Sequence, residues 1–417
     1  MADTTTPEID YTLNNPDTLT KYKTAAQISQ KVLETVTGWC VADRKVIEIC
    51  QRGDKLLDEE IGKVYKGKKI TKGISHPTTV SPSIWVTPYT PLVSDAEDAE
   101  TTLKAGEVVK IQLGAQIDGL GTIVCDTVIV PAKAGEDEEA VTGREADLMV
   151  ATHYANELLL RLMVPPGLLA AGTEEEKKKA AEEKPPTQAK ISALLEKVAK
   201  AYDCNIVENT TSWLFERNEI EGKKKIILSP GGGVRGDGSA ELLDVWGVEV
   251  GLSLGSGKVK NLPNRATLHR RTATTYQLKR PSSRSTLSEI VKKFGTFPFS
   301  LRQLDDEKAG KVGVIECVRG GVVRQYEPAG DADGEPVSRL LSTIAITKNG
   351  LIKLAAPPAL DLDQYKTEKK IEDEEILKIL EQPLARSTGG KGKNKKKKKK
   401  PAKKAGADEE EESSDEE

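Results

Sequence analysis

The sequence of 417 residues is poor in aromatic residues, which make up 4% of it, and it contains only three histidines. Histidine is the commonest proton carrier near neutral pH and the commonest metal ligand, so its scarcity limits acid–base catalysis and metal chemistry. One of the three, His153, lies near the packed face of a predicted helix, and we interpret it as a structural residue. The others are His76 and His269.

The five cysteines are odd in number, and no two of them are close in sequence. This spacing indicates neither a disulfide framework nor a metal knuckle, and it favours a reducing compartment. No run approaches the roughly 18 apolar residues that cross a membrane. The first residues also lack the apolar core and basic flank of a secretory signal. We therefore expect a soluble intracellular protein that contacts no membrane.

The formal net charge of −3 conceals a segregation of charge along the chain. Ten lysines lie between positions 391 and 404, and eight acidic residues lie between 408 and 417. Such blocks cannot form a core and are typical of disordered interaction tails. Ser413 and Ser414 lie in the acidic block and are candidate phosphorylation sites, where phosphate would compete for the lysines. The uninterrupted lysine run consists of Lys395, Lys396, Lys397, Lys398, Lys399 and Lys400.

The patterning divides the chain into three parts. Residues 1–18 are polar and without period, so we expect a disordered lead-in. Residues 19–385 carry the apolar periodicity of a folded domain, with a surface insertion rich in Glu, Lys and Ala at about 165–190. Residues 386–417 form the lysine-rich and then acidic tail.

Apolar residues recur at intervals of three and four in several segments, which predicts amphipathic helices. These helices are expected at residues 22–36, 46–64, 142–163, 191–202 and 287–294, and residues 365–380 are expected to form a terminal helix or arm. Short apolar or alternating runs predict strands at 226–228, 243–254, 312–323 and 340–354. A glycine-rich segment at 229–239 matches neither common phosphate-binding motif, so no nucleotide site is indicated.

The clearest local structure is a β-hairpin whose first arm alternates apolar and polar residues, as a strand with unlike faces does. Asp118-Gly119 follows this arm, and the pair suits a tight turn because such a turn needs positive φ. If these two residues form the loop, Ile123 lies opposite Gly114. Ile123 is then diagonally adjacent to Gln112 on one face of the hairpin.

Six short phrases and two basic segments occur in a recognisable order. The phrases are Leu19-Thr-Lys-Tyr-Lys, Arg52-Gly-Asp-Lys, Lys110-Ile-Gln-Leu-Gly, Val141-Thr-Gly-Arg-Glu-Ala-Asp, Val245-Trp-Gly-Val-Glu-Val and Asp361-Leu-Asp-Gln-Tyr-Lys-Thr-Glu. Together with the basic linker after the second helix and the lysine tail, they resemble the proliferation-associated and curved-DNA-binding nucleolar family. That family is a non-peptidase branch of the methionine aminopeptidase superfamily. The resemblance implies an α+β pita-bread fold, with mixed curved sheets flanked by helices.

The resemblance also implies where the peptidases of the superfamily hold two metal ions, with two aspartates, one histidine and two glutamates. The corresponding positions here are Gln112, Ile123, Thr210, Glu249 and Leu341, with Pro88 at an auxiliary histidine position. Hard divalent ions need carboxylate or imidazole donors, and only Glu249 supplies one. Without metal there is no activated water. We therefore expect no enzyme activity, no metal and no cofactor.

Lysine and arginine also gather at 66–72 and 258–284. Phosphate contacts from such residues give sequence-independent affinity for nucleic acid. Only Tyr65 and Tyr276 lie close to them, so base stacking is disfavoured and recognition of structured RNA by shape and backbone fits better. Besides the six tail lysines, the candidate nucleic-acid-binding residues are Lys66, Lys68, Lys69, Lys72, Lys258, Lys260, Arg265, Arg270, Arg271, Lys279 and Arg280.

The resemblance implies association with ribosomal RNA and the large ribosomal subunit, in nucleolus, nucleus and cytoplasm. A role in ribosome biogenesis, export or translation control follows, and we expect a monomer. A second hypothesis is a nuclear factor that binds curved DNA or nuclear proteins and holds a peptide in the degenerate pocket. A third is a residual hydrolase, which tightly bound metal would support.

Overall fold

A computed structural model of the chain describes residues 10–133 and 140–386. These residues belong to one compact unit, Met1–Arg386, and the remaining residues, Ser387–Glu417, form a separate unit. The tail lysines, Ser413 and Ser414 lie outside the described residues, as does the first half of the predicted lead-in. Within the part of the chain that is described, no helix is long and apolar enough to cross a membrane.

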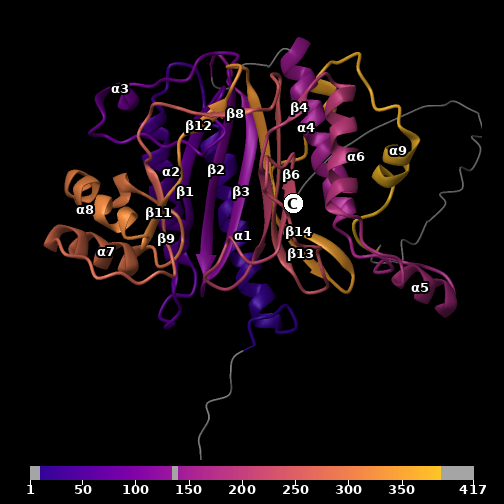
Figure 1. Ribbon diagram of the computed structural model, residues 1–417, viewed down its shortest axis with the longest axis horizontal. Coiled ribbons are helices and arrows are strands. Elements are labelled where there is room, and N and C mark those ends of the chain that lie inside the picture. The colour runs from indigo at the N-terminus through magenta and orange to yellow at the C-terminus, as the bar shows by residue number, and fades with distance from the viewer. Residues whose placement is uncertain (1–9, 134–139, 387–417) are drawn as a thin grey trace, which may run out of the picture. The chain divides into compact units, whose positions relative to one another are not determined.

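The unit is built on one sheet of nine strands (Figure 1). Seven of them follow one another in the order β1 (Lys72–Pro82), β2 (Val108–Ile117), β3 (Leu120–Ile129), β13 (Val337–Thr347), β7 (Val245–Ser253), β5 (Thr210–Phe215) and β6 (Lys225–Leu228). Strand β14 (Gly350–Ala355) pairs with β13, and β4 (Asn205–Ile206) pairs with β7. The pairing is antiparallel throughout these strands rather than mixed, and a parallel pairing occurs at the isolated bridge between Val141 and Tyr365.

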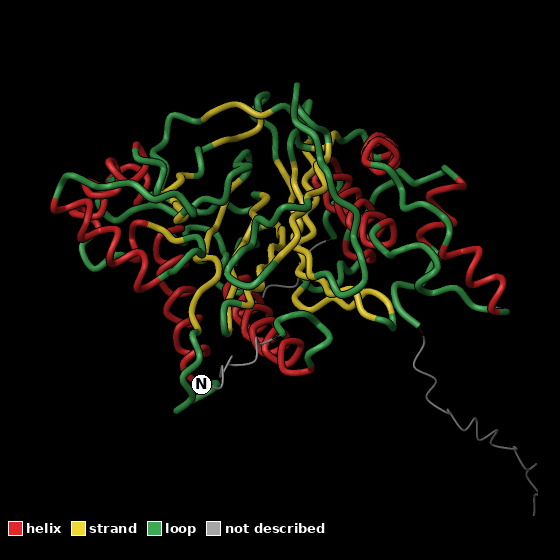
Figure 2. Tube along the Cα trace, turned by 60° about the horizontal axis from the view of Figure 1, so that its bottom comes forward, coloured by secondary structure: helices red, strands yellow, loops and turns green. Residues whose placement is uncertain are grey.

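Helices cover one face of this sheet. Figure 2 shows the strands in the centre, with helices along both flanks. The helices that pack on the sheet or on each other are α1 (Pro16–Thr37), α2 (Val46–Lys63), α4 (Gly143–Leu162), α6 (Gln188–Ala201) and α9 (Glu374–Leu380). Helix α5 (Glu174–Ala181) carries no buried residue and lies in the predicted surface insertion. This is the α+β pita-bread fold, so the predicted fold class is confirmed.

A smaller layer packs beside β1. It contains α7 (Pro281–Lys293), α8 (Glu307–Arg319) and a sheet of β10 (Phe299–Ser300), β9 (Leu268–Arg271) and β11 (Val323–Gln325), with a hydrophobic core of its own. The remaining elements are α3 (Ala96–Ala99), the β8 (Val259–Asn261) and β12 (Ala329–Asp331) pair, and two 3-10 turns at Leu301–Gln303 and Leu362–Gln364.

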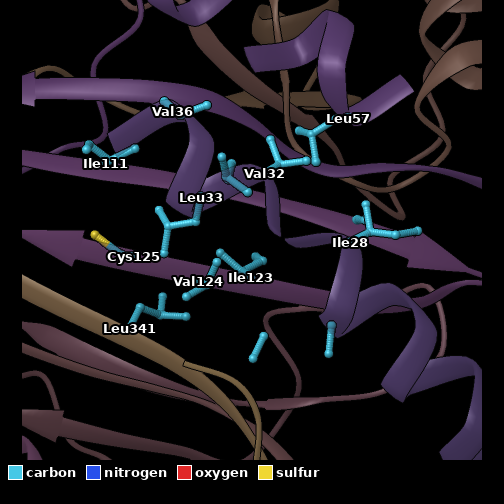
Figure 3. Close-up of a cluster of buried hydrophobic side chains, with 14 of the residues drawn as sticks. Ile28, Val32, Leu33, Val36, Leu57, Ile111, Ile123, Val124, Cys125 and Leu341 are labelled. Atoms are coloured by element: carbon cyan, nitrogen blue, oxygen red, sulfur yellow. The ribbon is translucent and has the colours of Figure 1, made fainter. Parts of the chain in front are cut away.

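Helix α1 explains why the hairpin is so well defined. Its residues Val32, Leu33 and Val36 are each at most 1% exposed, because they pack on the hairpin strands (Figure 3). The helix begins earlier than predicted, at Pro16, since the side chain of Asn15 accepts a hydrogen bond from the Asp17 amide. A side-chain acceptor at this position satisfies one of the free N–H groups of the first turn.

The predicted hairpin register is confirmed. Gly114 pairs with Ile123, and the two turn residues Asp118 and Gly119 have φ values of 58° and 77°. Lys21 and Arg217 bind the two carboxylate oxygens of Asp118, at 2.7 and 2.9 Å. The turn is therefore fixed by ion pairs as well as by its own sequence.

Three element predictions are corrected. Residues 312–319 belong to helix α8 rather than to a strand, because Gly310, Gly313, Val314 and Cys317 are buried at helical spacing, and Val323 begins β11. The segment 340–354 is not one strand but comprises most of β13 and most of β14. These two strands pair with each other, and Thr347 lies opposite Gly350 next to the turn. Only the last part of 365–380 is helical, as α9.

Candidate functional site

The sheet face away from the helices carries a pocket of about 420 Å³, which we name the degenerate pocket. Side chains alternate along a strand, so one face collects every second residue. Five of the six predicted positions line the pocket: Pro88, Gln112, Ile123, Glu249 and Leu341. They come from the segment after β1 and from β2, β3, β7 and β13, which are distant in sequence.

Thr210 is the exception. It does not line the degenerate pocket, and its hydroxyl donates to the carbonyl of Val207 at 2.9 Å. The neighbouring residues Asn209 and Thr211 line the pocket instead. Because the period of a strand is two, an error of one residue in placing this position moves the side chain to the other face.

The residue that the sequence did not single out is Arg339 on β13. Its Nε lies 3.1 Å from Oε1 of Glu249, and its Nη2 donates to Oε1 of Gln112. Its Nη1 donates to the carbonyl of Val86 at 2.8 Å. One guanidinium therefore joins the two polar residues at those predicted ligand positions that line the pocket. The available signal was the alternation of β13, which puts an arginine two residues before Leu341 on the same face.

Burial raises the pKa of Glu249 above its ordinary value, and the positive charge of Arg339 opposes this rise. The side chains of Glu249 and Arg339 are 19% and 9% exposed. The ion pair is thus largely removed from water, and each charge depends on the other for compensation.

The donor set does not fit the metal pair of the superfamily's peptidases. Glu249 is the one carboxylate among the predicted positions, and it is already engaged by Arg339. Ile123 and Leu341 present no donor atoms, and two divalent ions need several oxygen or nitrogen ligands. Within residues 10–133 and 140–386, no group of three or more His, Cys, Asp or Glu side chains is placed to hold a metal ion.

His76 also lines the degenerate pocket. Its Nδ1 lies 2.8 Å from the carbonyl oxygen of Pro77. Burial lowers the pKa of His76 to about 3, and the nearby Arg339 acts in the same direction. The imidazole is therefore neutral at physiological pH and a weak base.

Arg270, which the sequence predicts to contact nucleic acid, is instead paired with carboxylates near the degenerate pocket. The side chain of Arg270 is 9% exposed and pairs with Glu219 and with Glu221, the latter at 3.3 Å. Arg324 and the hydroxyl of Tyr326 bind Glu221 as well, at 2.6 and 2.8 Å. Arg270 is largely buried and already paired with two carboxylates, so we no longer expect it to contact phosphate.

The lysines between α2 and β1 fall into two kinds. Lys66, Lys68 and Lys69 are exposed and form no ion pair within the described residues, although Lys68 lies 5.5 Å from the ring centroid of Tyr65. Lys72 instead donates to the carbonyls of Ile61 and Val64, at 3.1 and 2.6 Å, at the C-terminal end of α2. We name the first three the loop lysines.

The segment 258–284 does not join the loop lysines in one patch. Lys258 and Arg265 each lie 3.4 Å from a carboxylate, of Glu208 and Asp95, and Lys260 donates to the carbonyl of Ala332. Strand β8, which carries Lys260, lies beyond the far end of β1 (Figure 1). The 11 residues of β1 span about 36 Å, at about 3.3 Å each.

The rest of that segment lies on the smaller layer. Arg271 pairs with Val323 at the edge of β9 and is partly buried. Lys279 and Arg280 precede α7, and their backbone amides donate to Glu316, at 2.7 and 3.0 Å. Their side chains are exposed. The predicted basic residues therefore form separate surfaces.

Comparison with known proteins shows full-length relatives. The chain is 38% identical over 391 residues to a "Curved DNA-binding protein" of Schizosaccharomyces pombe, covering 93% of this chain and 95% of the relative. It is 32% identical over 400 residues to "ERBB-3 BINDING PROTEIN 1" of Solanum tuberosum, covering 95% of both. A "Probable metalloprotease arx1" of Schizosaccharomyces pombe is more distant, with 24% identity over 69% of this chain and 75% of the relative. The first two of these relatives are thus named as binding proteins rather than enzymes.

A solved structure described as "Structure of a thermophilic Arx1" is 68% identical to this chain, with a TM-score of 0.88, and the match covers 89% of this chain and 100% of that one. No protein-family model matches the chain.

Proposed function

The chain belongs to the family of curved DNA-binding, ERBB-3-binding and proliferation-associated proteins, and from this premise we propose a non-catalytic protein that binds structured RNA of the large ribosomal subunit. The family is related to the methionine aminopeptidases. Loss of the chemistry with retention of the scaffold leaves a protein whose work is binding.

The contact between Arg339, Glu249 and Gln112 carries this proposal. It places a fixed positive charge among the ligand positions, where the related enzymes need a metal ion. A guanidinium is always protonated in proteins, so it neither activates water as a metal ion does nor gives up its proton. The degenerate pocket is then a structural element or a peptide-binding site.

The loop lysines support the choice of RNA. Three ammonium groups that have no carboxylate partner among the described residues stand on one short loop, so binding a phosphate backbone breaks no ion pair of that part of the chain. Lysine contacts of this kind give affinity without base readout, and they release counterions. Helical RNA, which proteins recognise mainly by its shape and backbone, suits such a surface.

The proposed setting is ribosome biogenesis, export or translation control, in nucleolus, nucleus and cytoplasm, with the protein acting as a monomer. No cofactor is required. The lysine run Lys395 to Lys400 would add unspecific affinity, and phosphorylation at Ser413 and Ser414 would weaken it by adding negative charge nearby.

Co-sedimentation with purified large ribosomal subunits at increasing salt tests the proposal. The triple variant Lys66→Glu, Lys68→Glu, Lys69→Glu is compared with Lys178→Glu, Lys179→Glu, Lys184→Glu, in which three exposed lysines of the surface insertion undergo the same change of charge. We expect binding to fall with salt and to fall at least tenfold further in the first variant only. Binding that is indifferent to salt and to both variants contradicts the proposal.

The name of the fission yeast relative favours a second candidate, binding of bent DNA. A competition at equal ionic strength between ribosomal RNA and curved DNA separates the two. If DNA displaces RNA at equal nucleotide concentration, DNA is the preferred ligand and the ribosomal proposal fails.

A further inference from the structure

A second cavity, of about 310 Å³, lies on the helix-covered face of the sheet. It is lined by Gln30 of α1, by one side of α4, by the end of β3, by alternate residues of β13, by Lys353 of β14 and by the segment that follows β14. We name it the α4 cavity. Ser338, Leu340 and Ser342 face it, whereas Arg339 and Leu341 face the degenerate pocket. The two spaces lie on opposite sides of the same strands.

The α4 cavity contains buried polar atoms without partners. Oδ1 of Asn156 and Oγ of Ser342 form no hydrogen bond within the described residues, although the two residues are only 5% and 1% exposed. Most buried polar side-chain atoms in proteins have a partner, and a buried one without a partner calls for an explanation. Both residues line the cavity, so a bound group can reach them.

Asp126 also lines the cavity, and among the described residues no cation is paired with its carboxylate. It accepts one hydrogen bond, from the amide of Thr127 at 2.8 Å, and it forms no ion pair within the described residues. The cavity's other carboxylate, Glu157, is paired with Lys353 and Arg161, at 2.6 and 2.7 Å. The negative charge that lacks compensation is therefore that of Asp126.

The strand register brings the three groups to one region. Leu341 pairs with Cys125, so Leu340 lies opposite Asp126 and Ser342 lies on the next position of that face. The sulfur of Met149 lies 3.8 Å from the hydroxyl of Ser338, which places α4 over β13. Asn156 follows Met149 by seven residues, about two helical turns, and so returns to the same side of α4.

We propose that the α4 cavity binds a small primary amine in its ammonium form. A primary ammonium has three N–H donors and no acceptor. Asp126, Asn156 and Ser342 offer three acceptor oxygens, and Asp126 supplies the opposite charge. Pro357, Pro358 and Leu360 give the cavity an apolar wall for a short aliphatic chain.

A divalent metal ion fits less well. Calcium and magnesium take six or more oxygen ligands, usually with more than one carboxylate. Asp126 is the cavity's one free carboxylate, and no cluster of metal-binding side chains occurs among the described residues. An anion is disfavoured by Asp126, because a like charge nearby costs free energy. The volume of about 310 Å³ is at the small end of ligand sites.

Three probes of one size and different charge test this inference on the full-length protein: n-butylamine, n-butanol and butyrate. Ligand-observed saturation-transfer NMR at pH 8 gives the apparent affinity. We expect transfer to n-butylamine, at least tenfold weaker binding of n-butanol, and none of butyrate. The same panel without protein gives the background.

Two variants locate the site. Asp126→Asn keeps the shape and the acceptor for the Thr127 amide and removes the charge, so the fold is retained. Asp126→Asn should weaken the binding of n-butylamine at least tenfold, whereas Glu327→Gln, in the degenerate pocket, should leave it unchanged. Ser342→Ala should weaken it severalfold by removing one acceptor. Equal binding of all three probes, binding of none, or affinity unchanged in Asp126→Asn would each overturn the inference.

Discussion

Arg339 and Glu249 face one another across β13 and β7, with Nε and Oε1 3.1 Å apart. Their strands pair directly, so the contact is built by the antiparallel register and not by proximity in sequence. Glu249 is one of the metal-ligand positions that the sequence predicts, and here a positive charge of the chain itself, that of Arg339, lies beside it.

We predict that Arg339→Met destabilises the protein. Removing one member of a buried ion pair leaves an uncompensated charge, which costs about 3–5 kcal/mol when burial is complete. Since Glu249 is 19% exposed, we expect the lower end of that range. Equilibrium unfolding in urea measures this loss in the free energy of unfolding.

The double variant Arg339→Met, Glu249→Gln is the control for that experiment. It removes both charges, so part of the lost free energy of unfolding should return. A double variant no more stable than the single one would show that packing of the arginine chain, rather than charge, explains the loss.

Purified protein should contain no stoichiometric divalent metal. Glu249 is the one carboxylate at the predicted ligand positions, and Arg339 already engages it. Elemental analysis by mass spectrometry after dialysis checks this, together with hydrolysis of a methionyl dipeptide in the presence of added manganese or cobalt. Tightly bound metal at one or two ions per chain would refute our account of the degenerate pocket.

Arg270→Met should lower stability without changing RNA affinity. The side chain compensates Glu219 and Glu221 and is 9% exposed, so its loss should cost about 2–4 kcal/mol. Thermal unfolding reports the first effect, and salt-matched RNA titration of the folded fraction reports the second. A selective loss of RNA binding at unchanged melting temperature would restore Arg270 as a nucleic-acid contact.

Asp126→Asn should make the protein more stable, and increasingly so as pH rises from about 4 to about 7. Burial raises the pKa of Asp126 to about 7, whereas the pKa of an unfolded aspartate is about 3.9. Between these values the folded state holds the proton more tightly, so the wild type loses stability as pH increases. Each pH unit contributes at most about 1.4 kcal/mol.

The comparison is between the two proteins at each pH, by urea unfolding. His153, Glu157 and Lys353 face the same cavity, but they are present in both proteins and largely cancel in the difference. A difference that stays constant from pH 4 to pH 7 would mean that Asp126 titrates normally.

Local chemistry made the hairpin predictable from the sequence. Alternation and the Asp118-Gly119 turn fix the register, and from the register follow the faces of Gln112 and Ile123. A short apolar run such as that of α8 suits either a strand or a buried helix, and here the packing of α8 against α7 favours the helix. One local feature of the sequence does indicate the start of this helix. The side chain of Asp306 caps it by accepting a hydrogen bond from the Ala309 amide.

Charge partners could not be predicted in the same way. Arg339 meets Glu249 and Gln112 across separations of 90 and 227 residues, which no local pattern encodes. Arg270 belongs to a basic segment in sequence, yet the fold places it beside two glutamates about 50 positions earlier. A run of like charge indicates surface potential only for the members that remain exposed.

The anchoring of the loop that carries Lys66, Lys68 and Lys69 has a thermodynamic consequence. Lys72 fastens one end to the last turn of α2, and the carbonyl of Thr71 accepts from the Asp118 amide at 2.6 Å. Gly67, at φ 73°, allows the chain to turn between the end of α2 and these anchors. Such a loop has already lost much of its backbone entropy before any partner arrives, so less of the free energy of the phosphate contacts is consumed in ordering it. We therefore expect Lys72, through its hydrogen bonds to the end of α2, to contribute to affinity by preorganising the loop.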